Sequence, residues 1–194
     1  MIRIEQLSGA GLEAHLTGLA RLRIEVFRAY PYLYDGDPDY EAWYLEDFVR
    51  AEGAVVIAAL DGGALIGAAT ASPMRAQKEA FRAPLAAAGL DPDALFYFGE
   101  SVLLANYRGH GIGHRFFDAR EAVARAQGFG RSGFYGVVRP VDHPRKPAGY
   151  SPLNTFWARR GYEPLAGAVA SFPWKEVGQA EETDHPMQFW SRAL

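Results

Sequence analysis

Three glycines alternate with other residues in one short segment, between a run typical of a buried strand and a run typical of an amphipathic helix. The segment reads Arg108, Gly109, His110, Gly111, Ile112, Gly113 and His114. The first turn of a helix leaves backbone N–H groups without partners, and the helix dipole adds partial positive charge there. Glycines let an anion approach those amides closely. The segment therefore predicts a pyrophosphate-binding turn, with the Arg108 guanidinium as a fixed cation beside it.

Two other phosphate-binding motifs do not fit this segment. A Walker loop needs Gly-Lys-Ser/Thr after its glycines, whereas His114 and Arg115 stand here. A dinucleotide fingerprint has the spacing Gly-x-Gly-x-x-Gly and an acid about twenty residues later. The spacing here is Gly-x-Gly-x-Gly, and no acid occurs between Glu121 and Asp142. A tight strand-to-helix turn without a ligand is the remaining alternative.

Glu100 is a carboxylate within an otherwise mostly apolar run, flanked by Phe98 and Val102. Apolar neighbours leave a carboxylate partly desolvated, as in carboxylates that act as general bases. Glu100 is therefore our candidate for a catalytic base. A structural hydrogen bond or salt bridge is an equally weighted alternative.

Tyrosines and carboxylates gather at residues 30–41. Aromatic faces and negative charge both attract cations. In the fold that the chain resembles, as described below, this region flanks the acceptor site, which implies that Tyr32, Tyr34 and Asp35 line a pocket for a cationic amine. The alternative is an ordinary connector between two helices with capping acids.

Other function classes find little support in the composition. The net charge of −3 and the absence of long apolar runs argue against nucleic-acid and membrane partners. The chain has no cysteine, which excludes disulfides and thiolate metal sites.

His110 and His114 have the spacing of a helical zinc pair, but glycines separate them and no ligating acid stands beside them, so we expect no metal. We expect a cytoplasmic protein, because the N-terminal residues lack the apolar core of a signal peptide.

The elements that must position these residues follow from periodicity. We expect one domain over residues 1–194 with the order β-α-α-β-β-(α)-β-α-β-α-β-β. The first helix starts at Ser8 or Gly9 and carries an apolar stripe to Val26, and Asp37-Pro38 starts the second. Strands are expected at 2–7, 54–60, 64–70, 95–104, 133–138, 169–174 and 187–193, and further helices at 76–88, 112–127 and 153–160. An early and a late hairpin indicate an α/β fold with a mixed sheet.

Two motifs resemble those of the GNAT superfamily of acyl-CoA-dependent N-acyltransferases. Residues 108–113, Arg-Gly-His-Gly-Ile-Gly, resemble its Arg/Gln-x-x-Gly-x-Gly/Ala signature. Residues 154–162, Asn-Thr-Phe-Trp-Ala-Arg-Arg-Gly-Tyr, resemble its second motif, in which an Asn opens a short helix. The order of strands and helices is similar to that fold throughout the chain.

The resemblance implies a central mixed sheet with a splayed strand pair, 95–104 and 133–138, flanked by helices. Acetyl-CoA would be the cosubstrate, with its pantetheine arm at Leu103, Leu104 and Asn154 and its pyrophosphate at 108–114. A backbone N–H near Leu103 would stabilise the oxyanion. The expected reaction is direct acetylation of a primary amine in a ternary complex, and proteins of this kind are often dimers.

The chain departs from the family at Trp157, which replaces the usual acid, a tyrosine. An indole cannot supply a proton at neutral pH. Tyr150 or His143 upstream are the candidate acids, or the thiolate leaves unprotonated. The departure also leaves room for a non-catalytic acyl-CoA sensor of the same fold. Transfer of a longer acyl group, or transfer to an amino-acid-type acceptor, is a further alternative.

Overall fold

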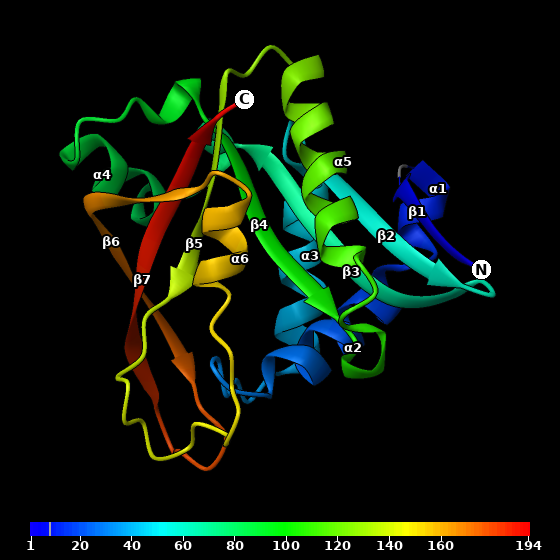
Figure 1. Ribbon diagram of the computed structural model, residues 1–194. Coiled ribbons are helices and arrows are strands. Elements are labelled where there is room, and N and C mark those ends of the chain that lie inside the picture. The colour runs from blue at the N-terminus through cyan, green and yellow to red at the C-terminus, as the bar shows by residue number, and fades with distance from the viewer. Residues whose placement is uncertain (8) are drawn as a thin grey trace.

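A computed structural model describes residues 1–7 and 9–194 (Figure 1), and their strands form one seven-stranded sheet. The strand order is β1-β2-β3-β4-β5-β7-β6. Neighbouring strands are antiparallel except for β4 and β5, which are parallel. The strands are β1 (Ile2–Leu7), β2 (Val55–Asp61), β3 (Ala64–Pro73), β4 (Phe96–Leu103), β5 (Arg131–Val137), β6 (Glu163–Lys175) and β7 (Glu182–Ala193). The mixed α/β sheet expected from the two hairpins is confirmed.

Helices cover both faces of the sheet (Figure 1). They are α1 (Gly9–Glu13), α2 (Leu16–Phe27), α3 (Pro38–Arg50), α4 (Glu79–Ala87), α5 (Ile112–Ala126) and α6 (Asn154–Arg159). Short 3-10 turns occupy Met74–Ala76, Pro92–Ala94 and Ala105–Tyr107. Leucines of α2 and α3 pack on one face of β2, β3 and β4. On the opposite face, Ile112 and Phe116 of α5 pack against β2 and β3.

Local signals account for several element boundaries. The Asp37 side chain accepts a hydrogen bond from the Tyr40 N–H at 2.8 Å, and Pro38 occupies the first helical position of α3. The turn between β2 and β3 places Gly62 and Gly63 at φ of 58° and 89°, a region that favours glycine. Both predicted starts, of the second helix and of the first hairpin, are confirmed.

Two predicted elements differ from the structure. The prediction of one continuous first helix is wrong, because α1 ends at Glu13 and α2 begins at Leu16. Ser8, one of its two predicted starting residues, lies outside the described residues. The His15 ring bonds the Gly11 carbonyl oxygen at 2.7 Å, at the break, and the glycines in this segment are weak helix formers.

The closing hairpin is longer than predicted, because β6 starts at Glu163 and β7 starts at Glu182. Residues 182–184, expected to lie outside the strands, pair with residues 173–175. Glu176 is not a loop acid in water. It is buried and pairs with Arg139 at 2.6 Å and with Arg145 at 3.3 Å. These long-range ion pairs allow the acid to be buried.

The predicted splay between two parallel strands is confirmed. β4 and β5 pair only at Phe96 with Ser132 and at Tyr97 with Gly133. Beyond these residues the two strands separate, and the sheet opens between its two halves (Figure 1). Among residues 1–7 and 9–194, no helix has both the length and the apolarity to cross a bilayer.

Candidate functional site

The glycine turn at the start of α5 has an open surface. Gly109 and Gly111 have φ of 80° and 77°, where side chains are strained. A Cβ added to either glycine would meet no atom within 4 Å. Gly111 is the N-cap of α5 and has no side chain that could accept hydrogen bonds from the first-turn amides. The turn therefore combines the amides and the open space that a bound diphosphate needs.

Some residues around this turn are exposed, and others pack against the rest of the fold. Arg108 and His110 are exposed, and the Arg108 Nε donates to the Leu103 carbonyl oxygen at 3.2 Å. Ile112 is buried under the turn. Gly113 lies against α6, since its added Cβ would be 3.6 Å from Phe156. The Leu104 N–H already donates to the Ile66 carbonyl oxygen at 3.0 Å, so this amide is committed within the fold.

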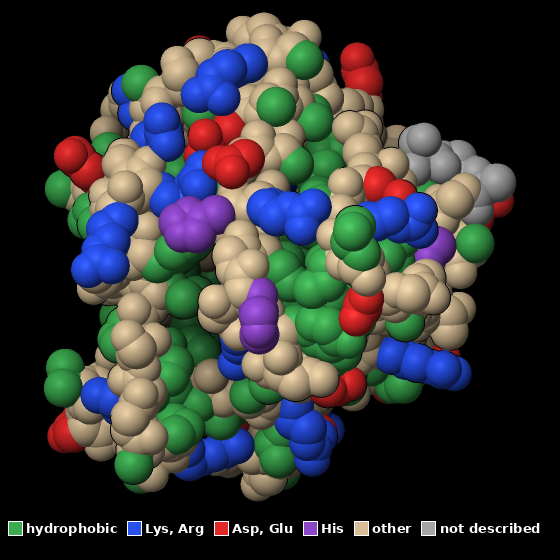
Figure 2. Space-filling model, turned by 45° about the vertical axis from the view of Figure 1, so that its right-hand side comes forward, with side chains coloured by type: hydrophobic (Ala, Val, Ile, Leu, Met, Phe, Trp, Pro, Cys, Tyr) green, Lys and Arg blue, Asp and Glu red, His purple; other side chains and the backbone are tan. Residues whose placement is uncertain are grey.

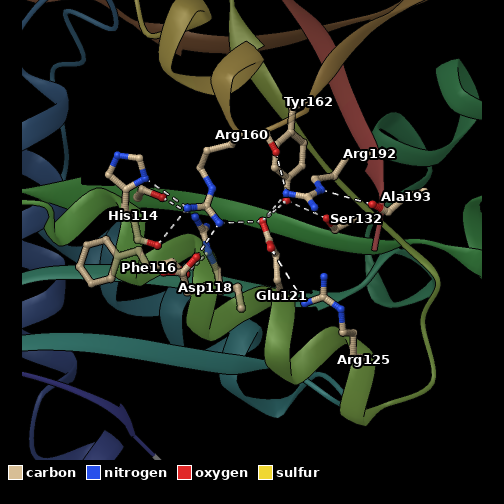
Figure 3. Close-up of polar contacts among 12 residues, drawn as sticks. His114, Phe116, Asp118, Glu121, Arg125, Ser132, Arg160, Tyr162, Arg192 and Ala193 are labelled. Atoms are coloured by element: carbon tan, nitrogen blue, oxygen red, sulfur yellow. Dashed lines mark hydrogen bonds and ion pairs between the residues drawn. The ribbon is translucent and has the colours of Figure 1, made fainter.

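His114 belongs to a polar network that links α5 to the other half of the sheet (Figure 3). Arg160, directly after α6, contacts the His114 ring at 3.2 Å and pairs with Asp118 at 2.7 Å and Glu121 at 3.1 Å. Glu121 is buried and also accepts from the Tyr162 hydroxyl at 3.1 Å. Because buried carboxylates must be compensated, this network fixes α5 against α6 and β6.

Helix α6 begins at Asn154, as predicted, and the Asn154 side chain is exposed. Trp157 packs edge-on against Phe134 and Trp190, with ring centroids 5.0 Å and 5.3 Å away. A Cβ at Gly136 would lie 2.7 Å from the Trp157 ring, so β5 accepts the indole only with glycine at this position. Trp157 therefore fills space between α6 and the sheet.

Glu100 joins a buried chain of charges on the sheet face that α2 and α3 cover. Its Oε1 lies 2.5 Å from Arg23 Nη1, and its Oε2 accepts from the Tyr44 hydroxyl at 3.4 Å. Arg23 also pairs with the fully buried Glu41. Burial opposes the charge on Arg23, but Glu100, Tyr44 and Glu41 raise its pKa well above the ordinary value. Glu100 is thus both a salt-bridge partner, the predicted alternative, and a carboxylate close to the opening of the sheet.

The predicted acceptor residues lie next to this charge chain. Burial, with help from the Glu100 carboxylate, raises the pKa of Tyr32 to about 12. Burial and the Glu41 carboxylate raise the pKa of Tyr34. Asp35 lies farther out, where its carboxylate pairs with Lys175 at 3.0 Å and Arg28 at 3.5 Å. The hydrogen bond from Lys175 is the main reason why the pKa of Asp35 is lowered.

The two candidate acids meet at one aromatic residue. Tyr150 packs edge-on against Tyr30 with ring centroids 4.7 Å apart, and His143 lies 5.5 Å from the same ring. Burial and the neighbouring Tyr30 raise the pKa of Tyr150. The Tyr150 hydroxyl is therefore protonated at neutral pH.

Figure 2 shows a hollow on the lower left of the displayed face, lined with hydrophobic side chains and bordered by Lys and Arg. Such a surface suits a ligand with an apolar arm and an anionic end. Within the described part of the chain, no three His, Asp or Glu side chains are grouped in a way that could hold a metal ion.

Comparison with known proteins decides the family. The family model for the acetyltransferase (GNAT) family matches residues 19–148, more than half of the sequence. This chain belongs to the GNAT acetyltransferase family. A search of curated proteins gives no significant match.

Solved structures share the GNAT fold at low sequence identity. A ribosomal-protein-alanine N-acetyltransferase from Brucella melitensis has a TM-score of 0.64 at 18% identity, with 99% of each chain covered. A putative acetyltransferase from Acinetobacter baylyi ADP1 has a TM-score of 0.67 at 13% identity, covering 100% of this chain and 92% of the other. The aminoglycoside N-acetyltransferase AAC(6')-Iy, in complex with CoA, has a TM-score of 0.54 at 18% identity, covering 82% and 84%. At these identities the likeness establishes the fold alone.

Sequence reasoning missed several buried charges of this GNAT chain, among them Arg23, Glu41 and Arg120. Each occupies the apolar stripe of its helix, four residues from a buried apolar side chain: Leu19, Leu45 and Phe116. A charge on a buried stripe must be paired or hydrogen-bonded. That signal was present in the sequence and could have found all three.

Proposed function

We propose that this GNAT protein is an N-acetyltransferase that moves an acetyl group from acetyl-CoA to a primary amine by direct attack in a ternary complex. The observation that carries the proposal is the opening between β4 and β5, with two features beside it. The open glycine turn of α5 lies on one side, and the Glu100 carboxylate lies on the sheet face that α2 and α3 cover. A thioester and an amine would then meet in the opening from opposite faces of the sheet.

The exposed turn supports the assignment of the CoA-binding residues. The backbone amides of residues 109–114 would hold the pyrophosphate, with the Arg108 guanidinium beside them. Leu103, Leu104 and Asn154 would contact the pantetheine arm. Since the Leu104 N–H is committed to Ile66, Leu104 would contribute its carbonyl oxygen or its side chain.

The chemistry requires a proton to leave the amine before its nitrogen attacks the thioester carbonyl. Glu100 would accept that proton, with its carboxylate held by Arg23 and Tyr44. A backbone N–H near Leu103 would donate to the oxyanion. The C–N bond forms and the C–S bond breaks. The nitrogen then loses its second proton, which reaches the leaving thiolate through Tyr150 or goes to solvent if the thiolate leaves unprotonated.

The acceptor would be a cationic amine. Tyr32 would offer an aromatic face near the Glu100 carboxylate and Tyr34 one near the Glu41 carboxylate, and Asp35 would add negative charge farther out. The single domain over residues 1–194, the cytoplasmic location and a homodimer stay predictions.

A non-catalytic acyl-CoA sensor is the second candidate, and Trp157 favours it. The indole fills the position of the family's usual acid and packs on β5. Release of free thiol from acetyl-CoA, measured over a panel of primary amines, distinguishes the two. Amine-dependent release supports the enzyme. Calorimetric binding of acetyl-CoA without release for any amine would support the sensor.

A further inference from the structure

Strand β4 contains a bulge at the proposed base. Across the β3–β4 ladder, Ala69 pairs with Ser101 and Ala71 pairs with Phe98. Thr70 alone therefore faces two residues, Gly99 and Glu100. One extra residue on a strand is the definition of a β-bulge, and it changes the face to which the following side chains point.

The two sides of the bulge pack on opposite faces of the sheet. Phe98 packs with Phe117 of α5, whereas Val102 packs with Leu19 and Leu45 of α2 and α3. In a regular strand these β4 residues would share a face with Glu100, because side chains alternate with a period of two. Without the bulge, Glu100 would point at the aromatic core under α5 and away from Arg23.

The bulge removes main-chain N–H and C=O groups from the strand ladder, and Thr70 and Arg120 supply hydrogen-bond partners for them. The Glu100 N–H donates to Thr70 Oγ1 at 3.1 Å. Arg120 Nη1 donates to the carbonyl oxygens of Glu100 at 3.2 Å and Thr70 at 3.3 Å. A Cβ at Gly99 would overlap Thr70 Oγ1, so glycine is required there. Buried main-chain groups need partners, and these two side chains supply them.

Arg120 is an unusual residue for this place in the core. It is 1% exposed and directs its hydrogen bonds to uncharged oxygens, including the Ser101 hydroxyl at 2.9 Å. Its guanidinium also lies 4.4 Å from the Phe98 ring centroid. Burial lowers the pKa of Arg120 to about 10, so it remains charged at neutral pH. Glu100 and Glu121 favour the charge on Arg120, but neither forms a direct ion pair with it. Burying a charge without a direct ion pair is costly, which points to a role beyond filling space.

We propose that Arg120 and Thr70 are positioning residues for the acetyl transfer, which hold the Gly99–Glu100 bulge and so turn the Glu100 carboxylate toward the acceptor. This inference rests on the proposed function and extends it to two residues that touch neither substrate. They act through the main chain of Glu100. The pyrophosphate-binding turn at the start of α5 does not contain them.

The central test uses Thr70→Val, which keeps the β-branched shape and removes only the acceptor for the Glu100 N–H. Ser72→Ala is the matched control, since Ser72 is fully buried on the same strand and its hydroxyl also accepts one hydrogen bond, from Gln77 at 2.8 Å. We expect Thr70→Val to lower kcat about 10-fold or more, with a smaller effect on the KM for acetyl-CoA, whose pyrophosphate would be held by the separate α5 turn. We expect Ser72→Ala to retain the wild-type kcat.

Arg120→Met and Arg120→Lys give a second reading. The methionine variant should lower kcat at least as much as Thr70→Val does. The lysine variant keeps a charged donor, so its kcat should lie between those of the methionine variant and the wild type. Unfolding temperatures and calorimetric acetyl-CoA binding are measured on every variant, so that Thr70→Val decides the question if Arg120→Met does not fold.

A double-mutant cycle with Glu100→Gln separates this inference from the proposed function. If the bulge acts through Glu100, Thr70→Val has no further effect on kcat in the Glu100→Gln background. Equal losses of kcat in both backgrounds, or a Thr70→Val variant that behaves like Ser72→Ala, overturn the inference while acetyl transfer stands. A wild-type protein that acetylates no amine overturns the proposed function itself, and a fully active Glu100→Gln variant removes Glu100 and the inference with it.

Discussion

The Nη1 atom of Arg23 lies 2.5 Å from Oε1 of Glu100, and both side chains are 9% exposed. Arg23 also pairs with Glu41, so one guanidinium from α2 joins a carboxylate of α3 to a carboxylate of β4. The proposed base is therefore held in one orientation by a charge that is itself fixed on its other side. The structure shows the salt-bridge interpretation of Glu100. Its role as the proton acceptor stays a prediction.

Replacing Glu100 with Gln should lower kcat by about 10²-fold or more, because the amide cannot accept the amine proton. Acetyl-CoA binding should not change, since the α5 turn is separate. Steady-state thiol release and calorimetry measure the two quantities. Glu25→Gln, a change at an exposed residue of α2, is the control. A Glu100→Gln enzyme with the wild-type kcat would remove Glu100 from the mechanism.

The Tyr150→Phe variant isolates one hydroxyl, because phenylalanine keeps the edge-on packing against Tyr30. If Tyr150 protonates the leaving thiolate, kcat should fall at least about 10-fold. Tyr30→Phe, which removes the neighbouring hydroxyl, should have little effect. The same kcat for Tyr150→Phe and wild type would mean that the thiolate leaves without this acid.

Asp35→Asn tests the acceptor site. Because the Asp35 carboxylate is shared with Lys175 and Arg28, its loss should raise the KM for a cationic amine only about 2-fold to 5-fold, the range of an exposed ion pair. The KM for acetyl-CoA should stay constant. Asp93→Asn, which also breaks a pair with an arginine, Arg82 at 3.4 Å, is the control. An unchanged amine KM would exclude Asp35 from the acceptor site.

His185 should make stability depend on pH. Burial lowers the pKa of His185, and the Arg139 guanidinium 3.2 Å away also lowers it, while the Trp174 carbonyl oxygen, Glu176 and Asp184 act in the opposite direction. Its ring also stacks on Trp174 and lies 3.2 Å from the Thr183 hydroxyl. In the unfolded chain His185 has an ordinary histidine pKa of about 6.5. Just below that pH, the His185 side chain therefore binds a proton more often in the unfolded chain than in the folded chain. The contribution of neutral His185 to the free energy of unfolding is therefore complete above about pH 6.5. It decreases as the pH falls below that value.

Urea unfolding at several pH values between 5 and 8 measures this effect. The His185→Asn variant should lose less of its stability on acidification than the wild type does. The exposed His110→Asn change should leave the wild-type pH dependence intact. If the free energy of unfolding depends on pH in the same way for wild type and His185→Asn, then His185 is not the source of the pH dependence.

The sequence predicted those parts of the fold that local signals determine. The Asp37-Pro38 helix start, the Asp61-Gly62-Gly63 hairpin and the glycine turn before α5 each depend on residues within a few positions of one another. The missed features depend on distant residues. Periodicity could not show that Glu176, directly after β6, is buried, because its ion pairs with Arg139 and Arg145 span 31 residues or more.

The candidate site divides in the same way. The glycine turn before α5 is a continuous segment and was predicted as one, and its role in anion binding stays a proposal. The surroundings of Glu100 come from α2, α3, β3 and α5, and no local pattern brings Arg23, Thr70 and Arg120 to one main-chain bulge. The helical stripes did carry a partial signal, since Arg23 and Arg120 interrupt apolar faces.

The measurement that tests the account most directly is a calorimetric titration of acetyl-CoA into wild type, Gly111→Ala and Gly89→Ala. Gly111 and Gly89 have φ of 77° and 79°, and a Cβ at either meets no protein atom within 4 Å, so both substitutions bring the same backbone strain. Only the Gly111 methyl group would enter the space assigned to the diphosphate. We predict saturable binding to wild type and Gly89→Ala, and binding at least about tenfold weaker to Gly111→Ala. No heat of binding to the wild type, or equal affinities in all three proteins, would contradict the account.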